Sequence, residues 1–296
     1  MKTKLPALVL WPALSIIASL VLGCSSKQKP TEPVILYHND FPSQWIESRN
    51  VEVWLPPDYD PNKEYDVLYM HDGQNVFNAT TAYGGIAWEA DSVMQSLLDK
   101  DLIRPAIVVG IWNSPKRFQE YMPNEPSDQI FALRKAAQSE EELLSDQYLK
   151  FIVEELKPFI DKEYSTKKEA SSTFIMGSSM GGLISLYALM KYPDVFGGAG
   201  CISTHWPALD GIFLEYLPGN LPDPDTHKLY FDHGTINLDS LYHPFQARVD
   251  SIVEASGYTS GQNWITLTFE GHDHNEAFWR DRLHRPLTFL LGKDQE

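Results

Sequence analysis

The segment 177–181 has the sequence GSSMG, which places Ser179 between two glycines in the spacing G-x-S-x-G. The run TFIM (173–176) before it suits a short strand, and the apolar run LISLYALM (183–190) after it suits a helix. A serine at such a strand–turn–helix junction is typical of a nucleophile elbow, in which the hydroxyl is exposed above a sheet. The segment therefore predicts Ser179 as the nucleophile of an acyl-transfer reaction. The structural alternative is an ordinary glycine-rich turn.

A serine hydroxyl is a weak nucleophile, so Ser179 needs a base. His272 and His274 both follow the apolar run WITLTF (264–269). His274 directly precedes a predicted helix, which would hold it in place, whereas His272 follows Gly271 in a turn. Because a base must be held within about 3 Å of the nucleophile, we expect His274 to be the base and His272 to face substrate or solvent. A zinc site that uses both histidines would leave the serine segment unexplained, so we expect no metal and no other cofactor.

The base in turn needs an orienting acid, and two aspartates are candidates. Asp232 directly follows the apolar run LYF (229–231), and Asp239 lies further along the same segment. In a parallel sheet both lie near the carboxyl end of that strand, where α/β proteins place their sites. Asp239 also suits the cap of the helix that follows. Position alone leaves both aspartates open as the acid.

The elements that must position these residues alternate along the chain. Strands are predicted at 49–55, 66–70, 106–111, 173–176, 200–202, 229–231 and 264–269. Helices are predicted at 88–100, 143–160, after Ser179, at 245–255 and at 276–291, and loops at 113–139 and 206–225. Such alternation implies an α/β fold with a mostly parallel central sheet and helices on both faces. The composition shows no linker within residues 34–296, so we expect one domain there.

The N-terminal segment differs from the rest of the chain. Two lysines precede an uncharged apolar run (5–22), and small residues and a cysteine follow. This order is typical of a secretory signal, and VLGC (21–24) is similar to a bacterial lipobox, in which the cysteine is lipidated. We therefore expect a signal peptide at 1–23, a lipid anchor on Cys24, a polar tether at 24–33 and a place in the cell envelope outside the cytoplasm. The alternative is an uncleaved membrane anchor.

The net charge and the cysteine content disfavour one class of partner and one kind of bond. The net charge of −16 disfavours nucleic acid, because a negative surface repels phosphate backbones. The chain has two cysteines, so lipidation of Cys24 would leave Cys201 without a disulfide partner. The apolar surroundings of Cys201 predict a small buried core residue.

Several segments together resemble the esterase branch of the α/β hydrolases, which includes feruloyl and acetyl-xylan esterases, enterobactin esterases, S-formylglutathione hydrolases and mycolyltransferases. The resemblance covers residues Trp45 to Leu291. It rests on VLYMHDGQNVF (67–77), PAIVVGIWN with RFQEYMP (105–123), GSSMGG (177–182) and HNEAFWRDRL (274–283). It implies the α/β-hydrolase fold and a serine esterase, that is, a carboxylic-ester hydrolase.

The resemblance also implies roles for individual residues. The N–H groups that hold the oxyanion belong to Gln74, which follows the Asp-Gly of the first motif, and to Met180, which follows the serine. The family histidine precedes a tryptophan by five positions, as His274 does. The stretch GTINLDS (234–240) is similar to the family's GTxD loop but longer, which points to Asp239 as the acid.

The leading functional hypothesis is hydrolysis of a carboxylic ester through an acyl-enzyme on Ser179. The expected substrate is an acylated carbohydrate or a similar ester outside the cytoplasm. Asp72 and Arg117 are candidates for contacting it; alternatively, Asp72 is a turn residue and Arg117 pairs with Glu120. The alternative functions are acyl transfer to a sugar and glycan binding by a lipoprotein that has lost the chemistry.

Overall fold

The computed structural model describes residues 32–136 and 142–293, and within them eight strands form one sheet. The strand order is β1-β2-β4-β3-β5-β6-β7-β8. The pairs β1–β2 and β2–β4 are antiparallel, and every later neighbour is parallel. The strands are β1 (Val34–Phe41), β2 (Arg49–Leu55), β3 (Asp66–His71), β4 (Ala106–Ile111), β5 (Thr173–Ser178), β6 (Gly198–Ile202), β7 (Lys228–Gly234) and β8 (Trp264–Phe269). The predicted α/β-hydrolase fold with a mostly parallel sheet is confirmed.

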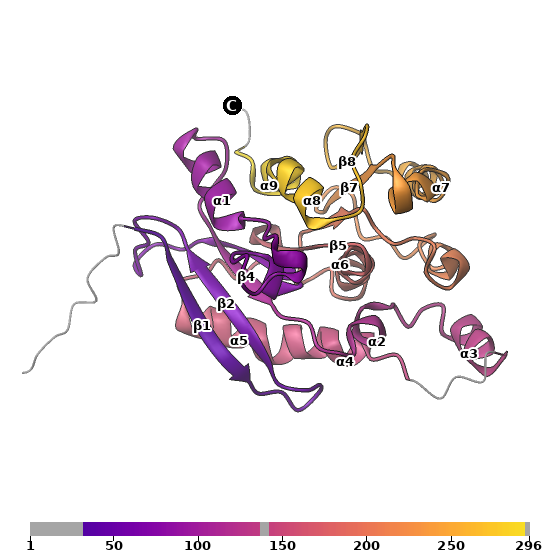
Figure 1. Cartoon of the computed structure of the whole chain (residues 1–296), viewed down its shortest axis with the longest axis horizontal. Coiled ribbons are helices and arrows are strands. Elements are labelled where there is room, and N and C mark those ends of the chain that lie inside the picture. The colour runs from indigo at the N-terminus through magenta and orange to yellow at the C-terminus, as the bar shows by residue number, and fades with distance from the viewer. Residues whose placement is uncertain (1–31, 137–141, 294–296) are drawn as a thin grey trace, which may run out of the picture.

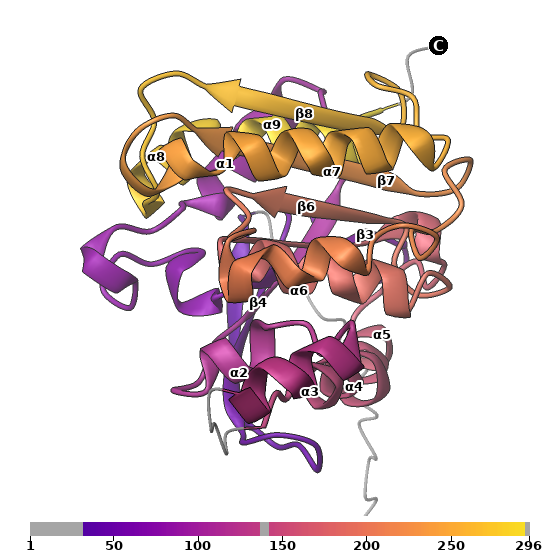
Figure 2. The same ribbon diagram turned by 90° about the vertical axis from the view of Figure 1, so that its right-hand side faces the viewer.

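Helices cover both faces of this sheet (Figures 1 and 2). One face carries α1 (Ala90–Asp99) and α9 (His284–Leu291); the other carries α4 (Ser145–Lys150), α5 (Lys157–Glu163), α6 (Met180–Lys191) and α7 (His243–Ala255). Alternate residues of a strand point to opposite faces, so Val67 and Tyr69 of β3 pack in one core cluster and Leu68 and Met70 in the other. The remaining helices are α2 (Arg117–Tyr121), α3 (Ser127–Ala136) and α8 (Glu276–Arg282).

Several elements differ from the sequence prediction. The edge strand β1 was not predicted, because VILYHNDF mixes apolar and polar residues without a clear alternation. The predicted loop at 113–139 contains α2 and α3. The predicted helix 276–291 is divided at Leu283 into α8 and α9. Pro286 explains this division, since proline lacks the N–H that would bond to Arg282 and its ring crowds that carbonyl.

The described residues include no helix that is both long and apolar enough to cross a membrane. The predicted signal peptide at 1–23, the lipidation site Cys24 and the tether up to residue 31 lie outside the described residues.

Candidate active site

Ser179 lies at the tight turn between β5 and α6. Its backbone angles, φ 58° and ψ −122°, are strained for a residue with a side chain, and such strain costs about 1–3 kcal/mol. Gly177 makes the turn sterically feasible, because a Cβ at this position would lie 3.0 Å from the backbone of Gly181. The sequence segment GSSMG therefore folds as a nucleophile elbow.

His274 stands between the serine and a buried carboxylate. Its Nε2 lies 2.9 Å from Oγ of Ser179, and its Nδ1 lies 2.6 Å from Oδ1 of Asp239. An ionised carboxylate only accepts hydrogen bonds, so Nδ1 carries the hydrogen and Nε2 is free to accept the serine proton. The structure thus brings together all three residues that the sequence suggested as nucleophile, base and acid.

Asp239 is held in its ionised form. It lies in the short helix η6 (Asn237–Leu241), and its side chain is fully buried. Burial alone would raise the pKa of Asp239. Hydrogen bonds from His274, from the Ser203 hydroxyl and from the Gly234 N–H outweigh burial and lower the pKa below its ordinary value. The carboxylate therefore carries a negative charge next to His274 at neutral pH.

The residues expected to hold an oxyanion both lie at starts of helices. Met180 is the first residue of α6, and Gln74 lies in the 3₁₀ helix η1 (Gly73–Asn75). N–H groups in a first helical turn lack partners inside the helix and attract negative charge. Gly73 lets this loop lie on β4, because a Cβ there would be 2.5 Å from the backbone of Gly110.

Asp72 and Arg117 form an ion pair at the pocket beside Ser179. Arg117 donates from Nε and Nη2 to the two oxygens of Asp72, each at 2.7 Å. Burial would raise the pKa of Asp72, but the charge of Arg117 and hydrogen bonds from Arg117 and Asn113 lower it. The alternative partner of Arg117, Glu120, instead pairs with Arg49 at 2.8 Å.

This pocket has a volume of about 410 Å³. Its lining is polar or aromatic throughout, and it includes Ser179 and His274 with Asp72, Gln74, Asn75, Tyr83, Asn113, Arg117, Ser178, Glu276 and Trp279. Glu276 was not singled out in the sequence, although it opens the helix next to His274. Burial, and then the nearby Asp72 charge, raise the pKa of Glu276.

The two remaining candidates both contact Arg282. The ring of His272, proposed to face the substrate or solvent, is outside the pocket lining and packs against Phe278 with ring centroids 4.8 Å apart. Its Nδ1 lies 3.4 Å from Nη1 of Arg282. Asp232, the other candidate acid, also faces Arg282, with Nη2 3.1 Å from its Oδ1. Arg282 is the residue that sequence reasoning missed, although it lies within the motif HNEAFWRDRL.

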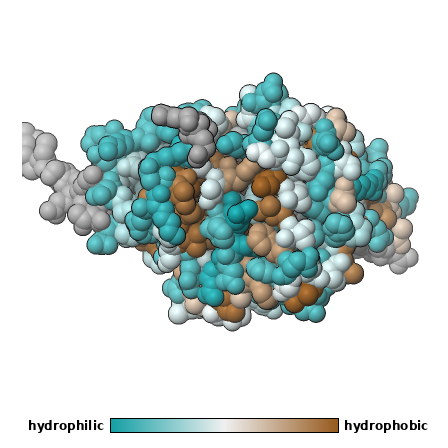
Figure 3. Space-filling model, turned by 90° about the horizontal axis from the view of Figure 1, so that it is seen from above, coloured by the Kyte–Doolittle hydropathy of each residue, from teal (hydrophilic) through white to brown (hydrophobic). Residues whose placement is uncertain are grey.

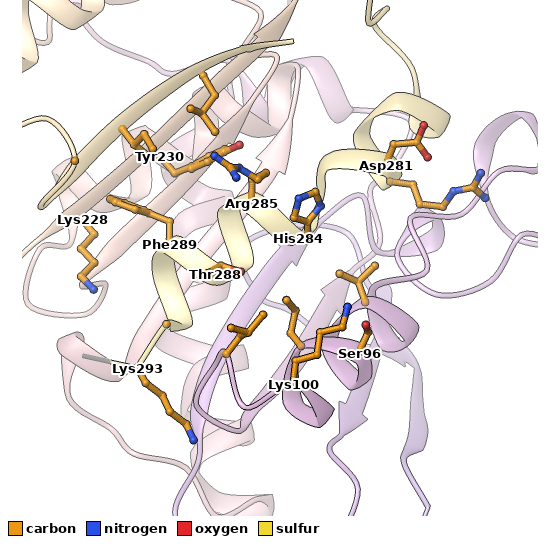
Figure 4. Close-up of a pocket in the computed structure, with 18 of the residues that line it drawn as sticks. Ser96, Lys100, Lys228, Tyr230, Asp281, His284, Arg285, Thr288, Phe289 and Lys293 are labelled. Carbon is orange, nitrogen blue, oxygen red and sulfur yellow. The ribbon is translucent and has the colours of Figure 1, made fainter. Parts of the chain in front are cut away.

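A larger groove of about 840 Å³ lies elsewhere, between α1, α9 and the strands β7 and β8 (Figure 4). Basic side chains of Lys100, Lys228, Arg285 and Lys293 surround apolar ones there. Seen from above, the face with α1 and α9 shows apolar patches among polar residues (Figure 3). Because the serine and its base line the smaller pocket, that pocket is the candidate active site. Within residues 32–136 and 142–293, no group of three or more His, Cys, Asp or Glu gathers as a metal site.

The sheet order and the serine elbow define an α/β hydrolase. The chain belongs to the family described as "Putative esterase", whose model matches residues 44–285. It is therefore a carboxylic-ester hydrolase.

The chain is also similar to individual proteins and solved structures. The uncharacterized protein YbbA of Bacillus subtilis is 23% identical over 264 residues, which cover 84% of this chain and 94% of YbbA. The ferri-bacillibactin esterase BesA of the same species is 28% identical over 178 residues, or 54% of this chain and 56% of BesA. An endo-1,4-beta-xylanase/feruloyl esterase of Xylanibacter ruminicola is 25% identical over 258 residues, or 83% of this chain and 30% of that protein. Among solved structures, a ferulic acid esterase matches with a TM-score of 0.63 at 18% identity, covering 88% of this chain and 98% of its own; it shows the common fold.

Proposed function

We propose that this protein is a serine esterase that cleaves carboxylic esters through an acyl-enzyme on Ser179. The observation that carries the proposal is the 2.9 Å contact between Ser179 Oγ and His274 Nε2, with Asp239 at 2.6 Å on the other ring nitrogen. This is the arrangement in which a histidine removes the serine proton and an aspartate stabilises the resulting imidazolium.

In the first step, Ser179 Oγ attacks the carbonyl carbon while its proton passes to His274. The carbonyl oxygen becomes negative, and the N–H groups of Gln74 and Met180 stabilise it. His274 then donates the proton to the leaving alcohol, and the acyl group remains on Ser179. Water then attacks the acyl-enzyme while His274 takes its proton. The bond between the acyl group and Ser179 Oγ breaks, His274 returns the proton to Oγ, and the acid leaves.

The proposed substrate is an acylated carbohydrate or a similarly polar ester. The polar side chains among the lining residues support this choice, because carboxylates and amides offer hydrogen bonds to the hydroxyl groups of such a substrate. Two relatives bear the names of a ferri-bacillibactin esterase and a feruloyl esterase, so esters of both kinds belong in the test. We assign Asp72 and Arg117 to substrate contact, since both line the pocket.

The proposed location is the cell envelope outside the cytoplasm, with a lipid on Cys24. The support for it is the sequence alone, in the apolar run 5–22 and the lipobox-like VLGC.

A panel of p-nitrophenyl, feruloyl and acetyl-sugar esters, tested with the purified chain and with Ser179→Ala, examines the function. Turnover of at least one ester that disappears in the variant supports it. A free sugar acceptor in the same assay separates hydrolysis from acyl transfer, because transfer gives an acylated sugar as product. Absence of both turnover and fluorophosphonate labelling would favour a glycan-binding protein.

A further inference from the structure

Two charged side chains are buried together behind the triad. Arg282, the last residue of α8, has a side chain only 1% exposed, and that of Asp232 in β7 is fully buried. Their closest atoms, Arg282 Nη2 and Asp232 Oδ1, are 3.1 Å apart. Moving both charges out of water is costly, and such a pair is often no more stabilising than apolar residues of similar volume. Stability alone therefore does not account for this pair, and its position beside the triad indicates a role in the reaction.

Both members of the pair hold Ser203, which follows β6. Arg282 Nη2 donates to the Ser203 hydroxyl at 2.6 Å, and Asp232 Oδ1 accepts the Ser203 N–H at 3.2 Å. Trp279 Nε1 also donates to this hydroxyl, at 3.1 Å. A hydroxyl has one hydrogen and two lone pairs, and Arg282 and Trp279 occupy both lone pairs. The hydrogen must therefore point to Asp239 Oδ2, 2.5 Å away.

The charge of Arg282 also acts on Asp239 directly, because Nη2 lies 3.8 Å from Asp239 Oδ2. Asp239 thus lies between Arg282 on one side and His274 on the other. When His274 takes the serine proton, the positive charge on Arg282 opposes the new imidazolium. The negative charge on Asp232 offsets Arg282.

We propose that Arg282 and Asp232 are positioning residues that set how strongly Asp239 stabilises protonated His274. This inference rests on the proposed triad. Both residues would thus affect the reaction, although neither of them is among the described residues that contact Ser179 or line its pocket.

Other titratable groups also face His274 and Asp239. His205, after β6, has its ring centroid 6.4 Å from that of His274, and its Nδ1 bonds to the Tyr242 hydroxyl at 2.7 Å. Tyr242 lies 5.5 Å from His274 by ring centroids, and Glu276 lines the pocket beside it. All three are unchanged in the variants below, so a difference between variants reports the buried pair.

The test is the pH dependence of kcat/KM for Asp232→Asn. Removing this negative charge leaves Arg282 uncompensated next to Asp239, so the imidazolium of His274 is less stable. The midpoint of the acid limb should move to lower pH by about half to one unit, as Coulomb's law gives for a nearby charge in a partly screened site. At the pH optimum, kcat/KM should fall about tenfold, the effect of one interaction. The double variant Asp232→Asn/Arg282→Gln removes both charges and should return the midpoint to that of the unchanged chain.

Asp66→Asn is the matched control. Asp66 is also fully buried and paired with two cations, Arg104 at 2.7 Å and Lys167 at 2.8 Å, but it lies at the first residue of β3, the opposite end from His71. This variant should lose thermal stability, and the midpoint of the acid limb of its kcat/KM profile should stay unchanged.

An Asp232→Asn variant that folds, by circular dichroism, and keeps the midpoint of the unchanged chain would overturn the proposal. If this variant does not fold, Arg282→Lys replaces it. Lysine keeps the charge but lacks the fork that contacts Ser203 and Asp232 together, so kcat should fall at constant KM. A folded lysine variant with unchanged kcat would then overturn the proposal. Failure of the unchanged chain to react with a fluorophosphonate would instead reject the serine mechanism itself.

Discussion

The side chain of Asn275 accepts a hydrogen bond from the Phe278 N–H at 3.3 Å. Asn275 is thus the N-cap of α8, and it directly follows His274 in the chain. Such an N-cap satisfies a free N–H group of the first turn and fixes the entry of the chain into the helix. The His274 N–H is also bonded, to Asp273 Oδ1 at 2.7 Å. His274 therefore projects from an anchored backbone.

His274→Ala should remove nearly all turnover, whereas His272→Ala should cost about tenfold or less. The first change removes the group 2.9 Å from Ser179 Oγ; the second removes a ring that packs on Phe278 and lies outside the pocket lining. The measurement is kcat/KM of both variants on one activated ester, with circular dichroism as the folding control. Equal and severe losses in two folded variants would contradict this assignment and call for a chelator test.

Ser179→Ala should fold normally and lose about 10⁶-fold in kcat, as triad knock-outs can. The neighbouring Ser178 is the matched control, because it is buried at the end of β5 and lines the same pocket. Fluorophosphonate labelling followed by peptide mapping identifies the reactive serine. Labelling that survives in Ser179→Ala but not in Ser178→Ala would mean that the elbow has been assigned in the wrong register.

Local sequence pattern was enough to predict most of the scaffold. The strands at 49–55, 106–111 and 264–269 have the predicted bounds, because continuous or alternating apolar runs mark strands. Residues of the elbow lie next to one another in the chain, so their geometry follows from the glycines around Ser179. It was also predictable that His274 and an aspartate of the segment after β7 would lie close together, since both follow strand ends that meet at one edge of the sheet.

Contacts between loops could not be predicted in the same way. Asp72 follows β3 and Arg117 begins α2, and Glu120 was an equally good partner for Arg117 by spacing. Only the packed structure shows that Glu120 forms its ion pair with Arg49, and that Arg117 pairs with Asp72. The choice between Asp232 and Asp239 likewise depends on where Arg282 is buried, which no periodicity reveals.

Asp239→Asn should lower kcat by up to about 10⁴-fold, because an amide does not stabilise the imidazolium and can select the wrong histidine tautomer. Asp232→Asn should lower kcat far less. Its carboxylate pairs with Arg282, whereas the carboxylate that contacts His274 Nδ1 is that of Asp239. Single-turnover kinetics of both variants on one ester provide the comparison. The reverse ranking would make Asp232 the acid.

Cys24→Ser should release the protein from membranes or block its processing. The lipid expected on Cys24 supplies the apolar anchor, and the polar segment SSKQKPTEP that follows has no membrane affinity of its own. Ser25→Ala, the adjacent change, is the control and should stay membrane-bound. Cell fractionation with N-terminal sequencing is the assay. Retention of Cys24→Ser with an intact N-terminus would indicate a transmembrane anchor.

Asp72→Asn should destabilise the protein at neutral pH and much less at acid pH. Burial raises the pKa of folded Asp72, but the attraction of Arg117 lowers it by more, so the pKa lies below its ordinary value of 3.8. A carboxyl with a lowered folded pKa binds protons more readily when unfolded, so its stabilisation is fully present above the unfolded pKa. That stabilisation is lost as the pH falls through the folded pKa. The unchanged chain should therefore exceed Asp72→Asn by about 1 kcal/mol in unfolding free energy at pH 7, because the Arg117 side chain that loses its ionised partner is 31% exposed and water replaces part of the interaction.

The difference should begin to shrink as the pH approaches the ordinary value of 3.8, and it should be lost once the pH falls through the lower folded pKa, where both chains carry an uncharged side chain at this position. Asp239 also has a lowered folded pKa, but it is present in both chains, so its effect cancels in the difference. Urea titrations at several pH values measure the difference, and Asp128→Asn, an exposed aspartate on α3, should show almost none at any pH. A difference for Asp72→Asn that stays constant from neutral to acid pH would show that its stabilising effect does not come from the ionised pair with Arg117.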